Sequence, residues 1–431
     1  MALFICSNCE YGSGSWLGRC PNCGEWNTLI ERESSSSKSS SKKPVEKLVL
    51  TQLSKIQTSS DSSRKKTKIF EFDRVLGGGF VPGEVLLLTG EPGIGKSTLL
   101  LQALANLKTV YVSGEEAGQQ VKDRAQRLKV DLRSFYFSDS LQIEGIIEGL
   151  DDLDEQIDVL VIDSVQTVYS KDVDGAVGSI NQLREVANKL IPYAKKKKVS
   201  LVLIGHVTKD GDIAGPKTLE HLVDCVINFE GEKLSHYRIL RATKNRYGST
   251  DEIGIFEMKE TGLSQVDNPL AFLEHVDEQI PGKTIVGVSE GKRPLFYEIQ
   301  TLVVPSSLSI PRRVVKGVDY NKVLLLLAVL RKHISLPLDT YDIYVNVIGG
   351  VQIRSTAADL GILASVISSV RNIAVPQKTV FIGEVGLLGE VRSVLMETKI
   401  VQEAKRLKFQ KIFSSSNLKN IKELSRILSA R

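Results

Sequence analysis

The chain has 431 residues, a length that predicts two or three domains. Its 42% hydrophobic and 25% charged residues are ordinary for a globular protein, and no run approaches the ~18 consecutive apolar residues that a membrane span requires. Phe4-Ile5 leads directly into a cysteine pair and not into a signal peptide, so we expect a cytoplasmic protein with no membrane partner. The net charge of +5 is compatible with nucleic acid as a partner but does not require it.

The first predicted element is a small metal-binding module over residues 1–30. Two C-x2-C pairs, separated by ten residues, have the spacing of a structural zinc site with four thiolate ligands. A module of this size cannot bury enough surface to fold alone, so the metal would supply the missing free energy. The alternative is a redox-active or disulfide-linked pair of motifs. The predicted zinc ligands are Cys6, Cys9, Cys20 and Cys23, and Trp16 and Trp26 are predicted to form the small core.

Residues 31–68 are predicted to form a flexible linker, because serines and lysines dominate there without apolar periodicity. Residues 69–267 alternate strand-like apolar runs with helical stretches, which is typical of a parallel α/β sheet. The predicted strands of this region are Val85–Thr89, Thr109–Ser113, Phe135–Phe137, Val159–Ile162, Leu201–Ile204, Cys225–Phe229 and Tyr237–Ala242.

Residues 268–431 form a second mixed α/β region. Its predicted strands are Thr284–Ser289, Phe296–Val304 and Tyr341–Val347. Its predicted helices are Asn321–His333, Ala357–Arg371 and a closing helix, Met396–Leu407.

A phosphate-binding loop follows the first predicted strand. Its sequence matches G-x-x-x-x-G-K-[ST] at every position and precedes a predicted helix, Leu99 to Leu107. The glycines let backbone N–H groups wrap the phosphates, and the helix N-terminus adds its positive dipole end. Lys96 would reach the β- and γ-phosphates, and the hydroxyl of Ser97 would bind Mg²⁺. The predicted nucleoside triphosphate site consists of Gly90, Glu91, Pro92, Gly93, Ile94, Gly95, Lys96, Ser97 and Thr98.

Two predicted strands lead into acids that suit this site. Asp163 closes a buried strand, where it would orient water bound to Mg²⁺, although such an acid can also be a helix cap. Glu115 and Glu116 follow the strand Thr109–Ser113, where a glutamate could activate the water that attacks the γ-phosphate. The residues alone do not choose between the two glutamates, and a solvated acidic helix start is the other interpretation.

The chain resembles the RecA-type ATPases, and specifically the bacterial RadA/Sms recombination and repair family, over essentially its whole length. The resemblance rests on the four-cysteine module together with Val75-Leu76-Gly77-Gly78-Gly79, Ser113-Gly114-Glu115-Glu116, the segment from Gly205 to Lys217, and Lys244-Asn245-Arg246-Tyr247-Gly248. It implies an α/β fold: a RecA-like P-loop ATPase with a parallel-type central sheet, plus the zinc module and a Lon-protease-like α/β C-terminal domain.

The same resemblance implies a function. The protein would be a DNA-dependent ATPase of homologous recombination and DNA repair that translocates on single-stranded DNA to process or branch-migrate recombination intermediates. Its expected cofactors are ATP, Mg²⁺ and Zn²⁺. Its expected partners are single-stranded and branched DNA, a RecA-type recombinase, and copies of itself in a hexameric ring.

Individual roles also follow from the resemblance. Glu115 matches the catalytic glutamate better than Glu116, and His206 looks like the sensor of the γ-phosphate, although a lone histidine at a strand end is otherwise structural more often. Lys244 and Arg246 would reach the nucleotide of the neighbouring subunit, and Tyr247 replaces the usual phenylalanine of that motif. The residues expected to contact DNA are Lys209 and Lys217 in one loop and Lys171 in a companion loop.

The likeness of residues 268–431 to the proteolytic domain of Lon-type proteases raises an alternative, an ATP-dependent protease. That chemistry needs a serine nucleophile activated by a lysine. Ala357 occupies the expected serine position, with Ser355 and Lys399 nearby, so we predict that the domain is proteolytically inactive. A nucleotide switch without DNA is a third hypothesis, although an N-K-x-D motif for guanine recognition is absent. Basic residues for a DNA-facing surface of this domain are Arg312, Arg313, Lys316, Arg331 and Lys332.

Overall fold

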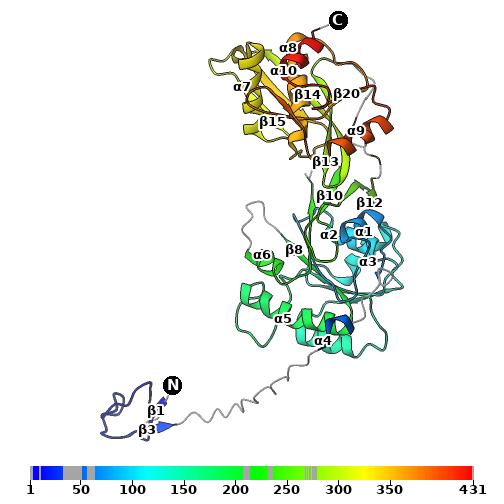
Figure 1. Cartoon of the computed structure of the whole chain (residues 1–431). Helices are drawn as coiled ribbons and strands as arrows, with labels where there is room; N and C mark the ends of the chain where they lie inside the picture. The colour runs from blue at the N-terminus through cyan, green and yellow to red at the C-terminus, as the bar shows by residue number, and fades with distance from the viewer. Residues whose placement is uncertain are drawn as a thin grey trace. The chain divides into compact units, whose positions relative to one another are not determined.

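The computed structural model describes residues 3–8, 11–32, 51–55, 64–206, 214–231, 236–266, 268, 270, 273 and 279–429 (Figure 1). The chain divides into two compact units, Met1–Ser59 and Ser60–Arg431. Within the described ranges, no helix is both long and apolar enough to cross a membrane.

The N-terminal unit contains a three-stranded antiparallel sheet of order β2-β1-β3. Its elements are β1 (Leu3–Cys6), β2 (Gly12–Ser13), β3 (Leu29–Arg32) and a short 3-10 helix, η1 (Leu53–Lys55). Among its described residues, Cys6, Cys20 and Leu29 form the buried cluster.

The prediction that Trp16 and Trp26 form the core of this module is wrong. Their exposed fractions are 55% and 68%. Among the described residues, the small interior is formed by Cys6, Cys20 and Leu29, with Phe4, Leu17 and Cys23 partly buried against them, and neither indole belongs to it. Trp16 donates a hydrogen bond from Nε1 to the carbonyl oxygen of Leu29, and the guanidinium of Arg19 lies over the ring of Trp26.

The second unit begins with a nine-stranded sheet of order β12-β11-β10-β9-β4-β8-β7-β5-β6. Its strands are β4 (Val85–Gly90), β5 (Thr109–Ser113), β6 (Phe135–Ser138), β7 (Val159–Asp163), β8 (Ser200–His206), β9 (Cys225–Glu230), β10 (Tyr237–Asn245), β11 (Ile253–Lys259) and β12 (Gly262–Gln265). The six strands from β9 to β6 are parallel, as predicted. Strands β10, β11 and β12, which continue the sheet beyond β9, are antiparallel.

Helices cover both faces of this sheet because the parallel strands are apolar on both sides. Leu86 and Leu88 of β4 pack with helices α1 and α2, whereas Val85 and Leu87 pack with α4, α5 and α6. The helices are α1 (Phe70–Leu76), α2 (Lys96–Ala103), α3 (Gly118–Arg127), α4 (Ile143–Asp151), α5 (Ile180–Lys197) and α6 (Ala214–Glu220). Helix α2 begins earlier and ends earlier than predicted, because Leu104 to Leu107 close in a turn.

A six-stranded sheet of order β15-β16-β14-β13-β17-β20 forms the C-terminal part of the same unit, in yellow-green to red in Figure 1. Its strands, with a separate β18–β19 hairpin, are β13 (Lys283–Glu290), β14 (Arg293–Pro305), β15 (Arg313–Lys316), β16 (Tyr341–Val347), β17 (Thr379–Phe381), β18 (Glu384–Val385), β19 (Val391–Arg392) and β20 (Lys411–Phe413). Helices α7 (Tyr320–Ile334), α8 (Asp359–Arg371) and α10 (Ile421–Ile427) pack on one face, and α9 (Glu397–Arg406) packs on the other.

Two predictions for this part need correction. The helix expected from Ala357 starts as a 3-10 turn, η4 (Thr356–Ala358), and a second 3-10 turn, η3 (Leu338–Thr340), precedes β16. The helix over Met396–Leu407 does not close the fold, because α10 follows it and packs against α7 and α8.

The two sheets of this unit meet through apolar packing and buried ion pairs. Ile253 and Ile255 of β11 belong to the same core as Val286 and Val288 of β13. Arg293 on β14 lies 2.6 Å from the fully buried carboxylate of Glu71 on α1. A charge this deeply buried persists only with a well-placed partner, so the pair fixes α1 against the C-terminal part.

Candidate functional site

The predicted phosphate-binding loop lies between β4 and α2, at the carboxyl edge of the parallel strands. Gly93 and Gly95 have φ angles of 77° and 112°, a region that favours glycine, and Gly95 is the N-cap of α2. Gly95 therefore leads directly into α2, whose first N–H groups have no partner within the helix, as anion binding at a helix N-terminus requires.

Lys96 is the first residue of α2 and is almost fully buried. Its Nζ donates hydrogen bonds to the carbonyl oxygens of Gly90 (2.8 Å) and Glu91 (3.1 Å) and lies 3.1 Å from Nδ1 of His206. Burial lowers the pKa of Lys96 to about 8, against the opposing effect of Asp163 and Glu115. This cation is thus held inside the loop by neutral partners that a phosphate could replace.

Ser97 and Asp163 lie together beside the loop. The hydroxyl of Ser97 donates to Oδ2 of Asp163 over 2.8 Å, and the hydroxyl of Tyr111 donates to the same oxygen. Burial raises the pKa of Asp163 above its ordinary value. Tyr111, on β5, was not among the predicted site residues. Its only sequence signal is a hydroxyl within an apolar strand adjacent to the strand that ends in Asp163.

Glu115 and Glu116 have different surroundings. Oε1 of Glu115 lies 3.0 Å from Nε2 of His206, although the two atoms do not meet in hydrogen-bond geometry. The carboxylate of Glu116 instead pairs with Arg124 on α3. Glu115 is therefore the glutamate that faces the phosphate-binding loop.

Oxygen ligands for a divalent cation gather at the same edge. Ligand atoms of Glu115, Asp163 and His206 all lie within 4.8 Å of one another. Because Mg²⁺ prefers oxygen ligands, the hydroxyl of Ser97 and the carboxylate of Asp163 are the donors at this edge that would fit it.

Lys244 and Arg246 lie at the opposite edge of the sheet. Asn245 pairs with Cys225, the first residue of β9, and Cys225 pairs with Leu86 near the start of β4. The six residues of β4 span about 17 Å at ~3.3 Å per residue, so neither cation reaches the phosphate-binding loop of its own chain. Nζ of Lys244 donates to the carbonyl oxygens of Glu220 and His221, and Arg246 pairs with Asp224.

Three cysteines of the N-terminal unit are arranged for a metal. The sulfurs of Cys6, Cys20 and Cys23 lie within 4.8 Å of one another, and those of Cys6 and Cys23 are 3.7 Å apart. Zn–S bonds of ~2.3 Å in a tetrahedron place sulfurs about 3.8 Å apart, so this set fits zinc. No disulfide joins these three cysteines, contrary to the disulfide alternative. Cys9, the fourth predicted ligand, lies outside the described residues.

The structure describes two of the three lysines predicted to contact DNA. Lys171 and Lys217 are exposed, whereas Lys209 lies outside the described residues. The loop that carries Lys171 is anchored at its base, because Ser170 donates to Glu144 and Gln182 donates to the carbonyl oxygens of Ser170 and Val173.

The protease-like position has no nucleophile. Ala357 is 1% exposed within η4, and Oγ of Ser355 accepts a hydrogen bond from the N–H of Ala357. Ser355 thus caps the turn.

Two of the basic residues predicted to face DNA have contacts within the domain. Arg313 donates to the carbonyl oxygens of Leu338 and Tyr341, and Arg331 forms an ion pair with Asp339.

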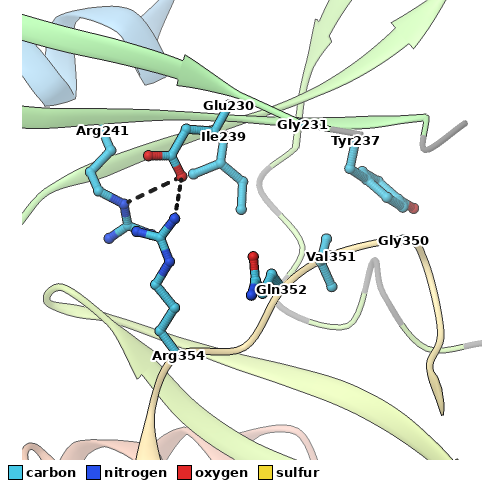
Figure 2. A pocket seen from close by; sticks show the side chains of 9 residues that line it. All are labelled: Glu230, Gly231, Tyr237, Ile239, Arg241, Gly350, Val351, Gln352 and Arg354. Atoms are coloured by element: carbon cyan, nitrogen blue, oxygen red, sulfur yellow. Dashed lines mark ion pairs between the residues drawn. The ribbon is translucent and has the colours of Figure 1, made fainter. Parts of the chain in front are cut away.

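A cavity of about 310 Å³, which the sequence does not predict, lies where β9 and β10 meet the loop before η4. Figure 2 shows Arg241 and Arg354 directed at Glu230. Oε2 of Glu230 lies 4.0 Å from Nε of Arg241 and 3.8 Å from Nη2 of Arg354. Glu230 follows Phe229, the register partner of Gly90, so the cavity lies beside the strand that flanks the phosphate-binding loop. Its lining residues come from distant segments, which no local pattern could have joined.

Comparisons with known proteins agree with both parts of this description. A family model of the KaiC ATPase matches residues 65–159, and a model of the rubredoxin metal binding domain matches residues 4–31. The DNA repair protein RadA of Listeria monocytogenes is 45% identical over 425 residues, covering 96% of this chain and 92% of that protein. The RadA proteins of Bacillus subtilis and Aquifex aeolicus are 44% and 42% identical, each covering 96% of this chain and 93% of that protein.

Two solved structures are also similar to this chain. The RadB recombinase covers 46% of this chain with a TM-score of 0.38 and 22% identity, over 97% of its own chain. A KaiC-like protein from Pyrococcus horikoshii covers 47% of this chain with a TM-score of 0.39 and 21% identity, over 98% of its own chain.

Proposed function

Since this chain belongs to the family of the bacterial DNA repair protein RadA, we propose that it is a DNA-dependent ATPase of homologous recombination and DNA repair. In this proposal it translocates on single-stranded DNA to process or branch-migrate recombination intermediates. The observation that carries the ATPase proposal is the convergence of Lys96, Ser97, Asp163, Glu115 and His206 on one edge of the parallel sheet.

The residues divide the work of hydrolysis between them. Lys96 would exchange its carbonyl partners for the β- and γ-phosphates, and Ser97 and Asp163 are the residues that would hold Mg²⁺. The metal supplies charge neutralisation on the phosphate oxygens when it is bound. Tyr111 keeps the carboxylate of Asp163 oriented through its hydrogen bond.

Glu115 activates and orients the attacking water in this scheme. Its carboxylate is exposed enough to meet solvent, with a side-chain exposed fraction of 39%, yet it lies beside His206. His206 in turn lies beside Lys96, so the histidine connects the water-activating group to the phosphate-binding cation. A change at the γ-phosphate would therefore reach β8 and the segment after it, which contains Lys209.

Lys244 and Arg246 act on the nucleotide of the next subunit, because they lie too far from their own. There they neutralise the charge that develops on the γ-phosphoryl group, as an arginine finger does. The proposal requires a closed, head-to-tail oligomer, for which a hexameric ring is the expected form.

The remaining parts complete the proposed motor. We keep the division into a zinc module (1–30), a linker (31–68), an ATPase domain (69–267) and an inactive Lon-protease-like domain (268–431). Zinc bound by Cys6, Cys9, Cys20 and Cys23 would stabilise the first module, which we propose contacts a RecA-type recombinase. Lys171, Lys209 and Lys217 would contact phosphates of single-stranded DNA.

The test is ATP hydrolysis by the full-length chain, with and without single-stranded DNA. We expect DNA to stimulate turnover, Lys96→Ala to abolish it, and Arg246→Ala to lower it by about 1000-fold if a finger is removed. Lys196→Ala, at the exposed end of α5, is the matched control for loss of a surface charge. Displacement of a labelled strand from branched DNA would measure translocation. A turnover that DNA does not change, with Arg246→Ala unaffected, would favour the nucleotide switch.

A further inference from the structure

Asp224 is a buried acid at the amino edge of the nine-stranded sheet, immediately before β9. It is 1% exposed. Its N–H donates to the carbonyl oxygen of Val85 (2.9 Å), and its Oδ2 accepts from the N–H of Val85 (3.2 Å). Val85 is the first residue of β4, which ends in the phosphate-binding loop. Both the backbone and the carboxylate of Asp224 are therefore fixed to that strand.

The other carboxylate oxygen of Asp224 faces Arg246. Nη1 of Arg246 lies 3.0 Å from Oδ1, and the N–H of Arg246 donates to the carbonyl oxygen of Asp224 over 3.1 Å. These two contacts hold the side chain at its base and at its guanidinium. The Arg246 side chain nevertheless keeps a 54% exposed fraction. It is thus oriented by a buried anion while still open to the surface.

Charge balance alone does not explain this pairing. A buried carboxylate needs a partner, but Lys195 at the end of α5 also lies 3.5 Å from Oδ1 of Asp224. Holding a long arginine side chain in one conformation costs conformational entropy. That cost is useful where the guanidinium must meet a target in a defined position, since a misplacement of about 1 Å can cost about 100-fold in rate.

We propose that Asp224 is a positioning residue for Arg246: it holds the guanidinium ready for the γ-phosphate of the neighbouring subunit and ties it to the strand of its own phosphate-binding loop. The inference rests on the proposed function, in which Arg246 acts in trans. It also connects Arg246 to the phosphate-binding loop of the same subunit, because Asp224 contacts Val85, the first residue of β4. Asp224 lies 22 residues before Arg246, outside the motif from Lys244 to Gly248.

The experiment uses full-length chains and measures kcat and KM for ATP in the presence of single-stranded DNA. Asp224→Asn keeps an acceptor for the N–H of Val85 but removes the charge that orients Arg246. We expect kcat to fall by about tenfold or more with KM changed by less than about threefold, since the variant alters placement of the finger and not nucleotide binding. Lys195→Met, which removes the second cation from the same carboxylate, should leave both constants unchanged.

The double variant Asp224→Asn/Arg246→Ala tests whether Asp224 acts only through Arg246. If Asp224 acts through Arg246, the double variant turns over no slower than Arg246→Ala alone. A further fall in the double variant, or an unchanged kcat in Asp224→Asn, would overturn the inference. Should Asp224→Asn fail to give a cooperative melting transition, Asp224→Glu is measured in its place, because it keeps the charge and displaces it by one methylene.

Mixed oligomers separate this inference from the proposed trans role. Lys96→Ala subunits offer an intact finger to their neighbours but have no active site of their own. Mixing them with Arg246→Ala subunits should restore turnover, and mixing them with Asp224→Asn subunits should do the same. Restoration of the first mixture alone would overturn the positioning role of Asp224. Restoration of neither would mean that the trans role of Arg246 itself is wrong.

Discussion

His206 and Glu115 face each other at the carboxyl edge of the nine-stranded sheet, with Nε2 of the histidine 3.0 Å from Oε1 of the glutamate. Nδ1 of the same ring lies 3.1 Å from Nζ of Lys96. One imidazole thus stands between the proposed water-activating carboxylate and the proposed phosphate-binding cation. This arrangement distinguishes Glu115 from Glu116, which the sequence alone does not.

Glu115→Gln should remove the proposed general base while keeping nucleotide binding. We expect kcat to fall by about 100-fold or more, because general-base catalysis contributes about 10²–10⁴-fold. Glu116→Gln is the matched control and should stay within about fivefold of the parent, because a partly exposed ion pair such as that with Arg124 contributes about 1 kcal/mol or less. Single-turnover hydrolysis and binding of a fluorescent ATP analogue give the two quantities. The reverse ranking of the two variants would assign the base to Glu116.

Nucleotide affinity should weaken in alkaline solution because of Lys96. Burial lowers the pKa of this lysine to about 8 in the unliganded site. A bound triphosphate favours the charged form, so binding takes up a proton and affinity falls as the pH rises above 8. At pH 9, one pH unit above that pKa, only about a tenth of the unliganded lysine is charged. The Kd should therefore be about tenfold larger than at pH 7.5.

Titration calorimetry of a non-hydrolysable ATP analogue between pH 7 and 9.5 measures this dependence. Phosphate itself does not interfere, since its second ionisation lies near pH 6. Lys96→Arg is the control, because a guanidinium stays charged throughout and should give a flat profile. A Kd of the parent protein that does not change up to pH 9.5 would contradict the buried, easily deprotonated lysine.

Local patterns were sufficient to predict the strand, glycine loop and helix around Lys96. Glycines, a lysine and a hydroxyl between a buried strand and a helix are consecutive in the chain, so the loop of Lys96 and Ser97 is a short-range feature. Asp163 and His206 were also predictable, because each ends an apolar run and the ends of parallel strands meet at one edge.

Long-range features escaped prediction for a physical reason. Asp224 contacts two residues that lie far from it in sequence, Val85 and Arg246. These contacts form only when β4 pairs with β9. The antiparallel strand β11 is buried on both faces at its start, so it lacks the alternation that identifies a strand. The prediction for Trp16 and Trp26 failed because large apolar residues usually fill a core, whereas the described core of this small unit consists of cysteine and aliphatic side chains with Phe4.

Loss of a cysteine should release zinc from the N-terminal unit. We expect about one zinc per chain in the parent protein and close to none in Cys20→Ser or Cys9→Ser, because structural zinc needs all four thiolates. Cys225→Ala, at a buried cysteine of β9, is the control and should keep its metal. Elemental analysis measures the content, and basal ATP hydrolysis should change less than the response to a RecA-type recombinase. An unchanged zinc content in both variants would reject the site.

Glu84 should make the second unit less stable as the pH rises from about 5 to 7. This carboxyl is fully buried before β4; its Oε2 accepts from the N–H of Val81, and its Oε1 has no hydrogen-bond partner among the described residues. Burial raises the pKa of Glu84 from 4.5 to about 7, so the folded state binds more protons than the unfolded state between those values. The free energy of unfolding therefore falls between pH 5 and pH 7 by on the order of 3 kcal/mol. Above pH 7 the contribution of Glu84 no longer changes with pH.

Glu84→Gln stays neutral and keeps the acceptor for Val81, so its melting temperature should exceed that of the parent at pH 8, with the difference disappearing near pH 5. Thermal unfolding followed by circular dichroism at both pH values provides the comparison. A difference that is the same at pH 5 and pH 8 would show that Glu84 does not titrate in this range.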